Sequence, residues 1–535
     1  MRCLFGILLF VTVAEAWRIS KWDNFKLFPA AHTRHLSSSA RAQFSAQTVY
    51  GLSSAIPDGG CGIAVTRISG RQSLKVLELL TKNEAARDSK SAFKCVPRMA
   101  TLRTVYDQAK FTPIDKAITI YFPGPNSYTG EDVVEIHTHG SRAIVSQLFA
   151  ALRCISRRHD IGIRQAERGE FTRRAFYNGK MDLTQAEAIR DIISSETALE
   201  MQNAALKLHG GLTQLYGTWA DRLNQLLATV EARIEFDEQA LADLNATHKE
   251  QTALLQGLTQ IQEEIEAQLE DSKGEILTSG ANVSILGPPN AGKSSLMNAI
   301  CDRRVAIVSD MPGTTRDLIQ VKYDLNGLKV TFVDTAGIRE MGDNVEAISH
   351  NEVEKQGIEK ALQHLNDTRL AIFLFDHTNV EHSQYALDTT LQNVPHDSQL
   401  IICVSKVDLI TTAQMTQYMR TLESRYGPRA QITSISNREP QSIEAMLQLV
   451  HQNLEKDLSH VQKQPFVTDA RHKSHLRNVL QQIKIALKSM ANTQSDLEIV
   501  AENIREATSQ IGYILGEQTN EHVLDAIFRT FCVGK

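Results

Sequence analysis

The chain has 535 residues, of which 42% are hydrophobic and 22% charged, and its formal net charge is -5. This length exceeds what one hydrophobic core supports, so three or four domains are expected. The charge argues against a dominantly basic nucleic-acid binder, although a local basic patch is compatible with it. The seven cysteines are scattered and contain no CxxC pair, which argues against a disulfide framework or a zinc site and favours a reducing compartment.

Residues 1–48 have the composition of a targeting segment. The apolar stretch CLFGILLFVTVAEA resembles a secretory signal, but residues 24–57 contain Arg and Ser and no Asp or Glu. That composition favours a mitochondrial transit peptide and a matrix location, with secretion as the alternative. No later run approaches the length of a membrane span.

The pattern of residues 49–166 predicts an α/β or α+β domain. The stretches CGIAVTRISG and KAITIYFPGPNSYTGEDVVEIHTHG indicate strands with Gly/Pro turns, and the helical stretch SLKVLELL lies between them. Between Arg153 and Arg174, five further arginines alternate with acidic residues. We interpret this run as a solvated face rather than as a patch for tRNA phosphates.

Apolar residues at helical spacing flank residues 276–456 on both sides. The pattern indicates either two unrelated bundles or one helical domain, 167–275 plus 457–535, into which a domain of residues 276–456 is inserted. The apolar positions are Leu254, Leu258, Ile261, Ile265 and Leu269 before it, and Leu476, Val479, Leu480, Ile483, Leu487 and Met490 after it.

The stretch ANVSILGPPNAGKSSLMNAI is the most specific in the chain. A short apolar strand leads into Gly287-x4-Gly292-Lys293-Ser294, and a helical pattern follows, which is the context that a P-loop requires. Backbone N–H groups of such a loop converge on phosphates, and the helix N-terminus adds positive potential. We expect Lys293 to reach the β- and γ-phosphates and the Ser294 hydroxyl to bind Mg²⁺.

Two further stretches complete a predicted nucleotide switch. KVTFVDTAG places Asp334 at the end of a strand, where it can hold Mg²⁺ through water, and Gly337 can donate its N–H to the γ-phosphate. SDMPGTTRD lies where a switch loop belongs, and Thr315 is the expected second hydroxyl ligand of Mg²⁺.

The base-recognition element departs from the usual pattern. In LIICVSKVDLI, Asp408 and Lys406 match the Asn-Lys-x-Asp element of GTPases, in which the Asp accepts hydrogen bonds from guanine, but Ser405 replaces the Asn. One support for the base is therefore lost or altered. In ITSISN, Asn437 stands where Ala is expected after Ser436. GTP remains the favoured nucleotide.

The catalytic group for hydrolysis is not the usual one. Ile338 stands where small GTPases commonly carry the Gln that orients water, so another residue must do so. The candidates are Glu340, Glu352 and Glu354, and Asn290 is a candidate ligand for a monovalent cation. The predicted nucleotide-binding set is Asn290, Ala291, Gly292, Lys293, Ser294, Ser295, Ser309, Gly313, Thr314, Thr315, Asp334, Thr335, Ala336, Gly337, Lys406, Asp408 and Ser436.

The chain ends in DAIFRTFCVGK. Val523, Leu524, Ile527, Phe528 and Phe531 lie on one predicted helical face, which runs directly into Cys532. A free cysteine is usually an inert small hydrophobe, but it is reactive where nearby positive charge lowers its pKa. Local physics leaves both alternatives open.

Seven motifs in order resemble those of the MnmE (TrmE) tRNA-modification GTPases, and of their mitochondrial branch in particular. They cover the chain from about Tyr50 to Lys535 and are GIAVTRISG, FPGPNSYTGEDVVEIHTHG, GEFTRRAFYNGKMDLTQAEAI, GPPNAGKSSLMNAI, PGTTRD, DTAGIRE and FCVGK. The resemblance implies a multi-domain α/β fold with an N-terminal folate-binding and dimerising domain, a discontinuous helical domain and an inserted Ras-like G domain.

The resemblance also implies an activity. Family members act with a flavin-dependent MnmG-type partner, which brings FAD and NADH, and modify carbon 5 of the wobble uridine (position 34) of certain tRNAs. A tetrahydrofolate derivative supplies one carbon, and glycine, ammonium or taurine completes the aminomethyl-type group. GTP hydrolysis with Mg²⁺, activated by K⁺, drives conformational change in a homodimer.

The resemblance assigns roles to particular residues. It implies a K⁺ site formed by Asn290, Ser309, Met311 and Thr314, with Ser294 and Thr315 as Mg²⁺ ligands. It selects Glu354 as the residue that positions water, although extra residues around NVEAIS precede this segment. It implies folate contacts at Arg67, Glu135, Lys180 and Lys535 and delivery of Cys532 to the one-carbon donor.

Two other functions remain as alternatives. One is a GTPase switch in mitochondrial ribosome assembly without modification activity, a class that lacks the folate module and the terminal FCVGK. The other is a scaffold with degraded nucleotide binding, which the departures at Ser405 and Asn437 motivate.

Overall fold

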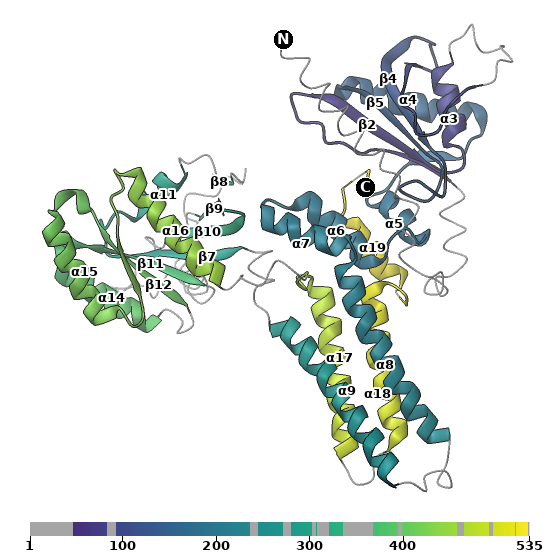
Figure 1. Ribbon diagram of the computed structural model, residues 1–535. Helices are drawn as coiled ribbons and strands as arrows, with labels where there is room; N and C mark the ends of the chain where they lie inside the picture. The colour runs from purple at the N-terminus through teal and green to yellow at the C-terminus, as the bar shows by residue number, and fades with distance from the viewer. Residues whose placement is uncertain are drawn as a thin grey trace, which may run out of the picture. The chain divides into compact units, whose positions relative to one another are not determined.

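A computed structural model gives the structure of most of the chain (Figure 1). It describes residues 47–82, 93–235, 244–270, 280–301, 306–307, 320–334, 368–393, 398–456, 465–491, 496–518, 520–532 and 534–535. The described residues divide into two compact units. One contains residues up to 186 together with 512–535, and the other contains residues 187–511.

The first unit is built on a six-stranded mixed sheet in the order β3-β4-β5-β2-β1-β6. Its strands are antiparallel neighbours, except that β1 and β6 run parallel. The strands are β1 (Thr48–Leu52), β2 (Cys61–Ser69), β3 (Thr101–Tyr106), β4 (Pro113–Phe122), β5 (Val133–Gly140) and β6 (Ile163–Gln165). One face packs on helices α3 (Ser73–Thr81) and α4 (Arg142–His159).

The two faces of this sheet differ in chemistry because side chains alternate along a strand. Tyr50 and Ile68 belong to the apolar core shared with α3 and α4. Gly51, Arg67 and Glu135 are paired across β1, β2 and β5 and therefore lie on the opposite face. That face receives helix α5 (Glu170–Tyr177) and the C-terminal residues described below.

Long helices form the next part of the chain, and four of them lie side by side (Figure 1). They are α8 (Gly211–Glu235), α9 (Leu244–Glu270), α17 (Ala470–Ala491) and α18 (Leu497–Leu515). The shorter helices are α6 (Leu183–Ser194), α7 (Ala198–Leu208) and α19 (Glu521–Arg529). The predicted apolar face of α9 is buried at Leu254, Leu258, Ile261 and Ile265, and that of α17 at Leu476, Val479, Leu480, Ile483 and Met490.

A seven-stranded sheet in the order β13-β12-β11-β7-β10-β9-β8 lies between α9 and α17 in the sequence. Strands β13, β12, β11, β7 and β10 are parallel neighbours, whereas at one edge β9 is antiparallel to β10 and β8 is antiparallel to β9. The strands are β7 (Ala281–Leu286), β8 (Ala306–Ile307), β9 (Gln320–Leu325), β10 (Leu328–Asp334), β11 (Leu370–Asp376), β12 (Gln399–Ser405) and β13 (Gln431–Ser434).

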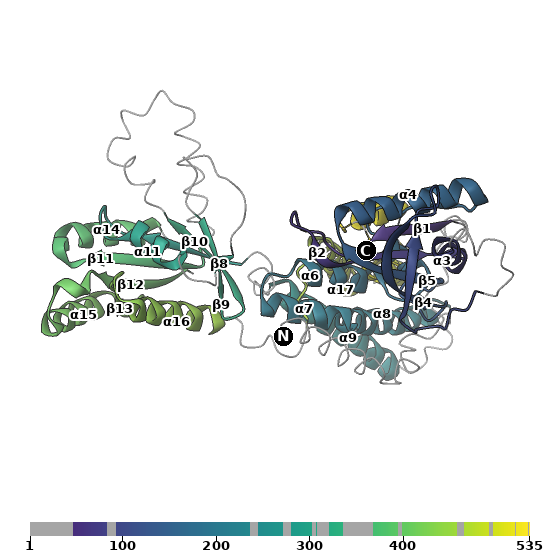
Figure 2. The ribbon, with the colours of Figure 1, turned by 90° about the horizontal axis from the view of Figure 1, so that it is seen from above.

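Helices cover both faces of this sheet (Figure 2). One face packs on α11 (Lys293–Cys301) and α16 (Pro440–Lys456), and the other on α14 (Val380–Asn393) and α15 (Thr412–Tyr426). The predicted α/β fold, with a helical domain interrupted by a P-loop domain, is confirmed. The exact domain boundaries at 166/167, 275/276 and 456/457 stay predictions. No helix among the described residues is long and apolar enough to span a membrane.

Candidate functional site

The phosphate loop connects β7 to α11, as the sequence predicts. Gly287 has φ +147, and a Cβ there would lie 2.7 Å from the carbonyl oxygen of Leu374, so only glycine fits without a shift. Asn290 lies on the exposed turn of the loop with φ 62, a left-handed conformation. The helix begins at Lys293, so its free N–H groups face the loop.

Lys293 and Ser294 take up positions suited to phosphate and Mg²⁺. The buried Lys293 Nζ donates to the carbonyl oxygens of Gly287 (3.0 Å) and Pro288 (2.9 Å), which holds the ammonium over the loop. Ser294 Oγ donates to Asp334 Oδ2 at 3.0 Å. A hydroxyl and a carboxylate are oxygen ligands of the kind that Mg²⁺ prefers. Ala291 is buried beneath the loop, and Ser295 is exposed on the first turn of α11.

The base-recognition residues gather at the ends of β12 and β13. Lys406 has φ 60, and its Nζ lies 2.6 Å from Asp376 Oδ2. Asp408 accepts a hydrogen bond from Ser436 Oγ at 3.0 Å and pairs with Arg438 at 3.3 Å. Sequence reasoning missed Asp376 and Arg438, since neither belongs to a motif.

Part of the predicted nucleotide site lies outside the described residues. These positions are Ser309, Met311, Gly313, Thr314, Thr315, Thr335, Ala336, Gly337 and the three candidate glutamates Glu340, Glu352 and Glu354. Their roles therefore stay predictions.

The C-terminal residues close onto the start of α5. The N–H of Phe171 donates to the carbonyl oxygen of Lys535 (3.2 Å), and that of Gly169 to the carbonyl oxygen of Cys532 (3.5 Å). Ser53 Oγ donates to the carbonyl oxygen of Gly534 at 3.0 Å. Helix N-termini have unpaired N–H groups, and here the chain terminus supplies acceptors for them. We call residues 530–532 together with 534–535 the C-terminal arm.

Helix α19 anchors this arm. Leu524, Phe528 and Phe531 are buried, and the rings of Phe528 and Phe176 lie 6.3 Å apart. Gly169 has φ +68, and a Cβ there would lie 2.4 Å from the carbonyl oxygen of Phe528. The close contact between the start of α5 and the end of α19 therefore requires glycine at position 169. Val523, which the sequence pattern places on the same apolar face, is 40% exposed, so the buried stripe of the helix is narrower than the apolar pattern.

Arg67, Glu135 and Lys535 come together beside the arm. Arg67 donates to Glu135 Oε1 through Nη2 (2.9 Å) and Nε (3.2 Å), and its guanidinium carbon lies 4.7 Å from the centre of the Tyr128 ring. Burial, and next the charge of Arg67, lower the pKa of Lys535. A carboxylate, a guanidinium and an ammonium thus share one partly buried face of the sheet.

Two other predicted residues lie apart from these contacts. Cys532 is an exposed free cysteine, and its role in the reaction stays a prediction. Lys180 Nζ donates to the carbonyl oxygen of Pro125 at 3.1 Å, on the connection between β4 and β5. No hydrogen bond or ion pair described for Lys180 joins it to Arg67 or Glu135.

Comparison with known proteins decides the family. The pattern described as MnmE helical domain matches residues 183–532, and that described as GTP-binding protein TrmE N-terminus matches 48–180. The chain is 35% identical over 495 residues to the tRNA modification GTPase MnmE of Rickettsia typhi, covering 91% of this chain and 100% of that protein. The chain belongs to the MnmE/TrmE family of tRNA modification GTPases.

This family includes a mitochondrial relative. The 5-taurinomethyluridine-[tRNA] synthase subunit GTPB3, mitochondrial, of Danio rerio is 35% identical over 500 residues, covering 91% of this chain and 93% of that protein. Among solved structures, the G domain of the T. maritima FeoB iron transporter matches with a TM-score of 0.23 and 18% identity, covering 33% of this chain and 98% of that chain.

The arginine run of this MnmE-family chain is not simply a solvated face. Arg173 and Arg174 are buried, and Arg173 pairs with Glu521 and Asp525 of α19 at 2.7 Å each. Arg174 pairs with Glu131 and Glu170 at 2.9 Å each. The prediction failed here because the acidic partners of Arg173 lie far along the chain.

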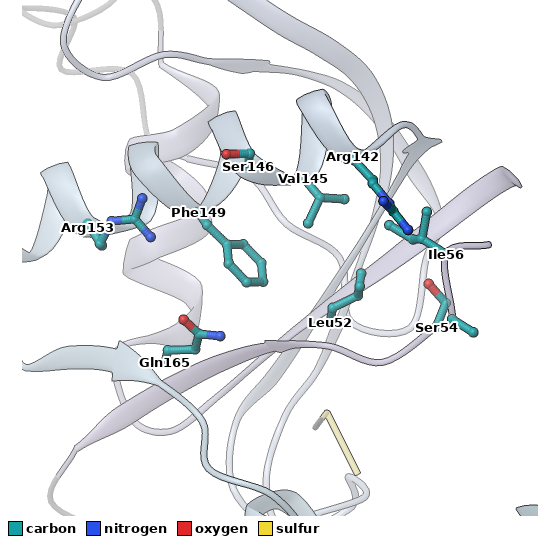
Figure 3. A pocket seen from close by; sticks show the side chains of 10 residues that line it. Leu52, Ser54, Ile56, Arg142, Val145, Ser146, Phe149, Arg153 and Gln165 are labelled. Carbon is teal, nitrogen blue, oxygen red and sulfur yellow. The ribbon is translucent and has the colours of Figure 1, made fainter. Parts of the chain in front are cut away.

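The pocket in Figure 3 is distinct from the Arg67–Glu135 face. It has a volume of about 590 Å³, and Leu52, Arg142, Phe149 and Arg153 contribute to its wall. Leu52 follows Gly51 and therefore points to the opposite side of the sheet, toward α4. None of the predicted site residues that the structure describes lines this pocket.

A buried polar cluster joins α6, α8 and α17 within the second unit. Glu187 accepts from Arg471 Nη2 (2.9 Å) and lies 2.8 Å from His472 Nε2, and His472 Nδ1 lies 3.1 Å from the Tyr216 hydroxyl. Burial by itself would raise the pKa of Glu187, but His472 and Arg471 outweigh it and lower the pKa to about 2.

Replacing Glu187 with glutamine should lower the free energy of unfolding at pH 7 by about 3 kcal/mol, since it leaves the Arg471 guanidinium and the buried His472 ring without their carboxylate partner. The folded-state pKa is depressed, so this contribution is complete above the unfolded pKa of about 4.3 and is lost as pH falls toward 2. Urea unfolding, followed through the fluorescence of the buried Trp219, should show that the difference in unfolding free energy between the wild type and Glu187→Gln shrinks between pH 5 and pH 3.

The matched control is Glu231→Gln, because Glu231 is an exposed partner of Arg505 in the same helical region. We expect it to change stability by less than about 0.5 kcal/mol. A Glu187→Gln effect that is equally large at pH 3 and pH 7 would contradict the assigned pKa direction.

Proposed function

We propose that this chain is the GTP-hydrolysing subunit of a complex that installs an aminomethyl-type group on C5 of the wobble uridine (position 34) of mitochondrial tRNAs. Membership of the MnmE/TrmE family supports tRNA modification, and the mitochondrial Danio relative, named a synthase subunit, supports a mitochondrial location and a partner subunit. Within the mitochondrion, the matrix is the proposed compartment. That relative's name also favours taurine as the amine.

The observation that carries the proposal is the docking of the C-terminal arm beside Arg67 and Glu135. A carboxylate suits the amidine-like donor edge of a pterin, and cations suit the carboxylates of a glutamyl tail. Arg67, Glu135 and Lys535 therefore fit a tetrahydrofolate derivative, which would supply the one-carbon unit. Cys532, exposed on the same arm, would lie near the transferred carbon.

In the G domain, the chain's own residues would bind and orient GTP. Lys293 would place positive charge against the β- and γ-phosphates, and Ser294 and Asp334 would hold Mg²⁺. Asn290, Ser309, Met311 and Thr314 would form a K⁺ site that supplies the charge of an arginine finger, and Glu354 would position the attacking water. A flavoprotein of MnmG type, with FAD and NADH, and a second copy of the chain complete the complex.

Titration of the full-length chain with 5-formyl-tetrahydrofolate tests the folate site. We expect saturable binding, and Glu135→Gln should weaken it roughly 10-fold because a charged hydrogen-bond acceptor is lost. Glu78→Gln is the control, since Glu78 pairs only with Lys75 and Lys82 on α3 among the contacts described. Unchanged affinity in Glu135→Gln would show that Glu135 does not bind the folate derivative. No binding by the wild-type chain would contradict the proposed folate site.

A further inference from the structure

Asn437 connects the base-recognition region to the phosphate loop. Its Nδ2 donates to the carbonyl oxygen of Gly292 at 3.0 Å, across 145 positions of sequence. A carbonyl oxygen only accepts, so this contact requires the amide NH₂ of Asn437 to face the loop. A Cβ at Gly292, where φ is +99, would lie 3.0 Å from the same nitrogen, so the Asn437 side chain packs closely against the loop backbone at Gly292.

The residue before Asn437, Ser436, contacts the carboxylate that is predicted to bind the guanine base, Asp408. Ser436 is buried, and its Oγ donates to Asp408 Oδ1 at 3.0 Å. Ser442 fixes the backbone of Ser436 on both sides, because its Oγ accepts from the Ser436 N–H (3.0 Å) and donates to the Ser436 carbonyl oxygen (2.8 Å). Two consecutive residues of one fixed turn therefore make both contacts: Ser436 contacts Asp408, and Asn437 contacts Gly292 of the phosphate loop.

Ser405 does not provide such a link. Its side chain is buried, and Oγ donates to the carbonyl oxygen of Phe375 at 3.3 Å on the neighbouring strand β11. The Ser405 carbonyl oxygen lies 2.8 Å from His377 Nδ1. The amide that the Asn-Lys-x-Asp pattern places at this position is therefore absent, and an amide is present instead at 437, next to the same site.

The other end of the Asn437 amide points to a ligand. Asn437 Oδ1 is buried and has no hydrogen-bond partner among the described residues. Buried polar atoms are normally paired, and an orphan acceptor beside a phosphate loop is expected to find its donor when the site is filled.

We propose that Asn437 is a positioning residue for guanine recognition that replaces the support lost at Ser405. By tying the Ser436–Asn437 turn to Gly292, it fixes the distance between the phosphate loop and Asp408, so that Asp408 meets the guanine edge when the phosphates are bound. The inference rests on the guanine-nucleotide site proposed above and adds a determinant of its selectivity.

The test is calorimetric titration of the full-length chain with GDP and with inosine diphosphate, which lacks the exocyclic amine that Asp408 would accept from. In Asn437→Ala, GDP affinity should fall roughly 5- to 10-fold, and the preference for GDP over inosine diphosphate should shrink. A purely structural role would weaken both ligands equally. Ser405→Asn added to Asn437→Ala should restore much of the preference.

Asn453→Ala is the matched control. Asn453 is a buried asparagine of the same domain that donates to Gln431 and to the carbonyl oxygen of Leu449. It should leave the GDP preference unchanged. An unaltered preference in Asn437→Ala, or an equal loss in the control, would overturn the inference, and a double variant that stays as poor as Asn437→Ala would reject the shared role with position 405. Failure of the wild-type chain to bind GDP would instead defeat the proposed function.

Discussion

Gly534→Val should abolish wobble-uridine modification while GTP hydrolysis by the G domain continues. Gly534 has φ +92, and a Cβ there would lie 1.8 Å from the carbonyl oxygen of Leu52. A valine fits neither the conformation nor the space, so the arm must leave its place beside β1. The contacts of Ser53 with Gly534 and of Phe171 with Lys535 would then be lost.

The expected effect is large because the displaced arm carries both Cys532 and Lys535. Modification, measured by mass spectrometry of tRNA from cells that depend on the variant, should fall to the level found in cells that lack the chain, a loss of at least about 10-fold. Gly162→Ala is the control in the same unit, since a Cβ there would meet nothing within 4 Å. Full modification with Gly534→Val would show that the docked arm is dispensable.

Lys293→Ala should reduce GTP hydrolysis by at least about 100-fold, the usual cost of removing one charged group that stabilises the transition state. The buried Nζ is held by the carbonyl oxygens of Gly287 and Pro288, directly above the loop that would receive the phosphates. Phosphate release by the purified full-length chain measures the effect.

Lys484→Ala is the matched control, since this lysine is exposed and pairs with Glu266 in the helical region. Near-normal hydrolysis by Lys293→Ala would show that the P-loop lysine is not needed for hydrolysis.

The same assay tests the proposed K⁺ site. The wild-type chain should hydrolyse GTP several-fold faster in K⁺ than in Na⁺, and Asn290→Ala should remove that difference. Equal wild-type rates in both salts would contradict the proposed cation site.

The nucleotide loop and the helical faces were predictable because their signals are local. Gly287, Gly292 and Lys293 stand at fixed spacing between a strand and a helix, and the buried faces of α9 and α17 repeat at helical intervals. The approach of the arm to Arg67 and Glu135 was predicted from family resemblance alone. Local physics gave no reason for it.

What could not be predicted depends on pairs distant in sequence. Arg173 looked like a surface charge because its partners Glu521 and Asp525 lie in α19. Asn437 looked like a departure from a motif, whereas its amide contacts Gly292. Neither residue carries a local signal, because the benefit of each arises only after folding brings a buried partner within hydrogen-bond distance.

The most direct test of the central claim is mass spectrometry of the wobble uridine in mitochondrial tRNAs from cells that lack this chain. The proposal predicts substrate tRNAs without the C5 group, full recovery with the wild-type chain, and no recovery with Gly534→Val even though that variant hydrolyses GTP. Wobble uridines that remain fully modified without the chain would contradict the claim and would favour a GTPase switch in mitochondrial ribosome assembly.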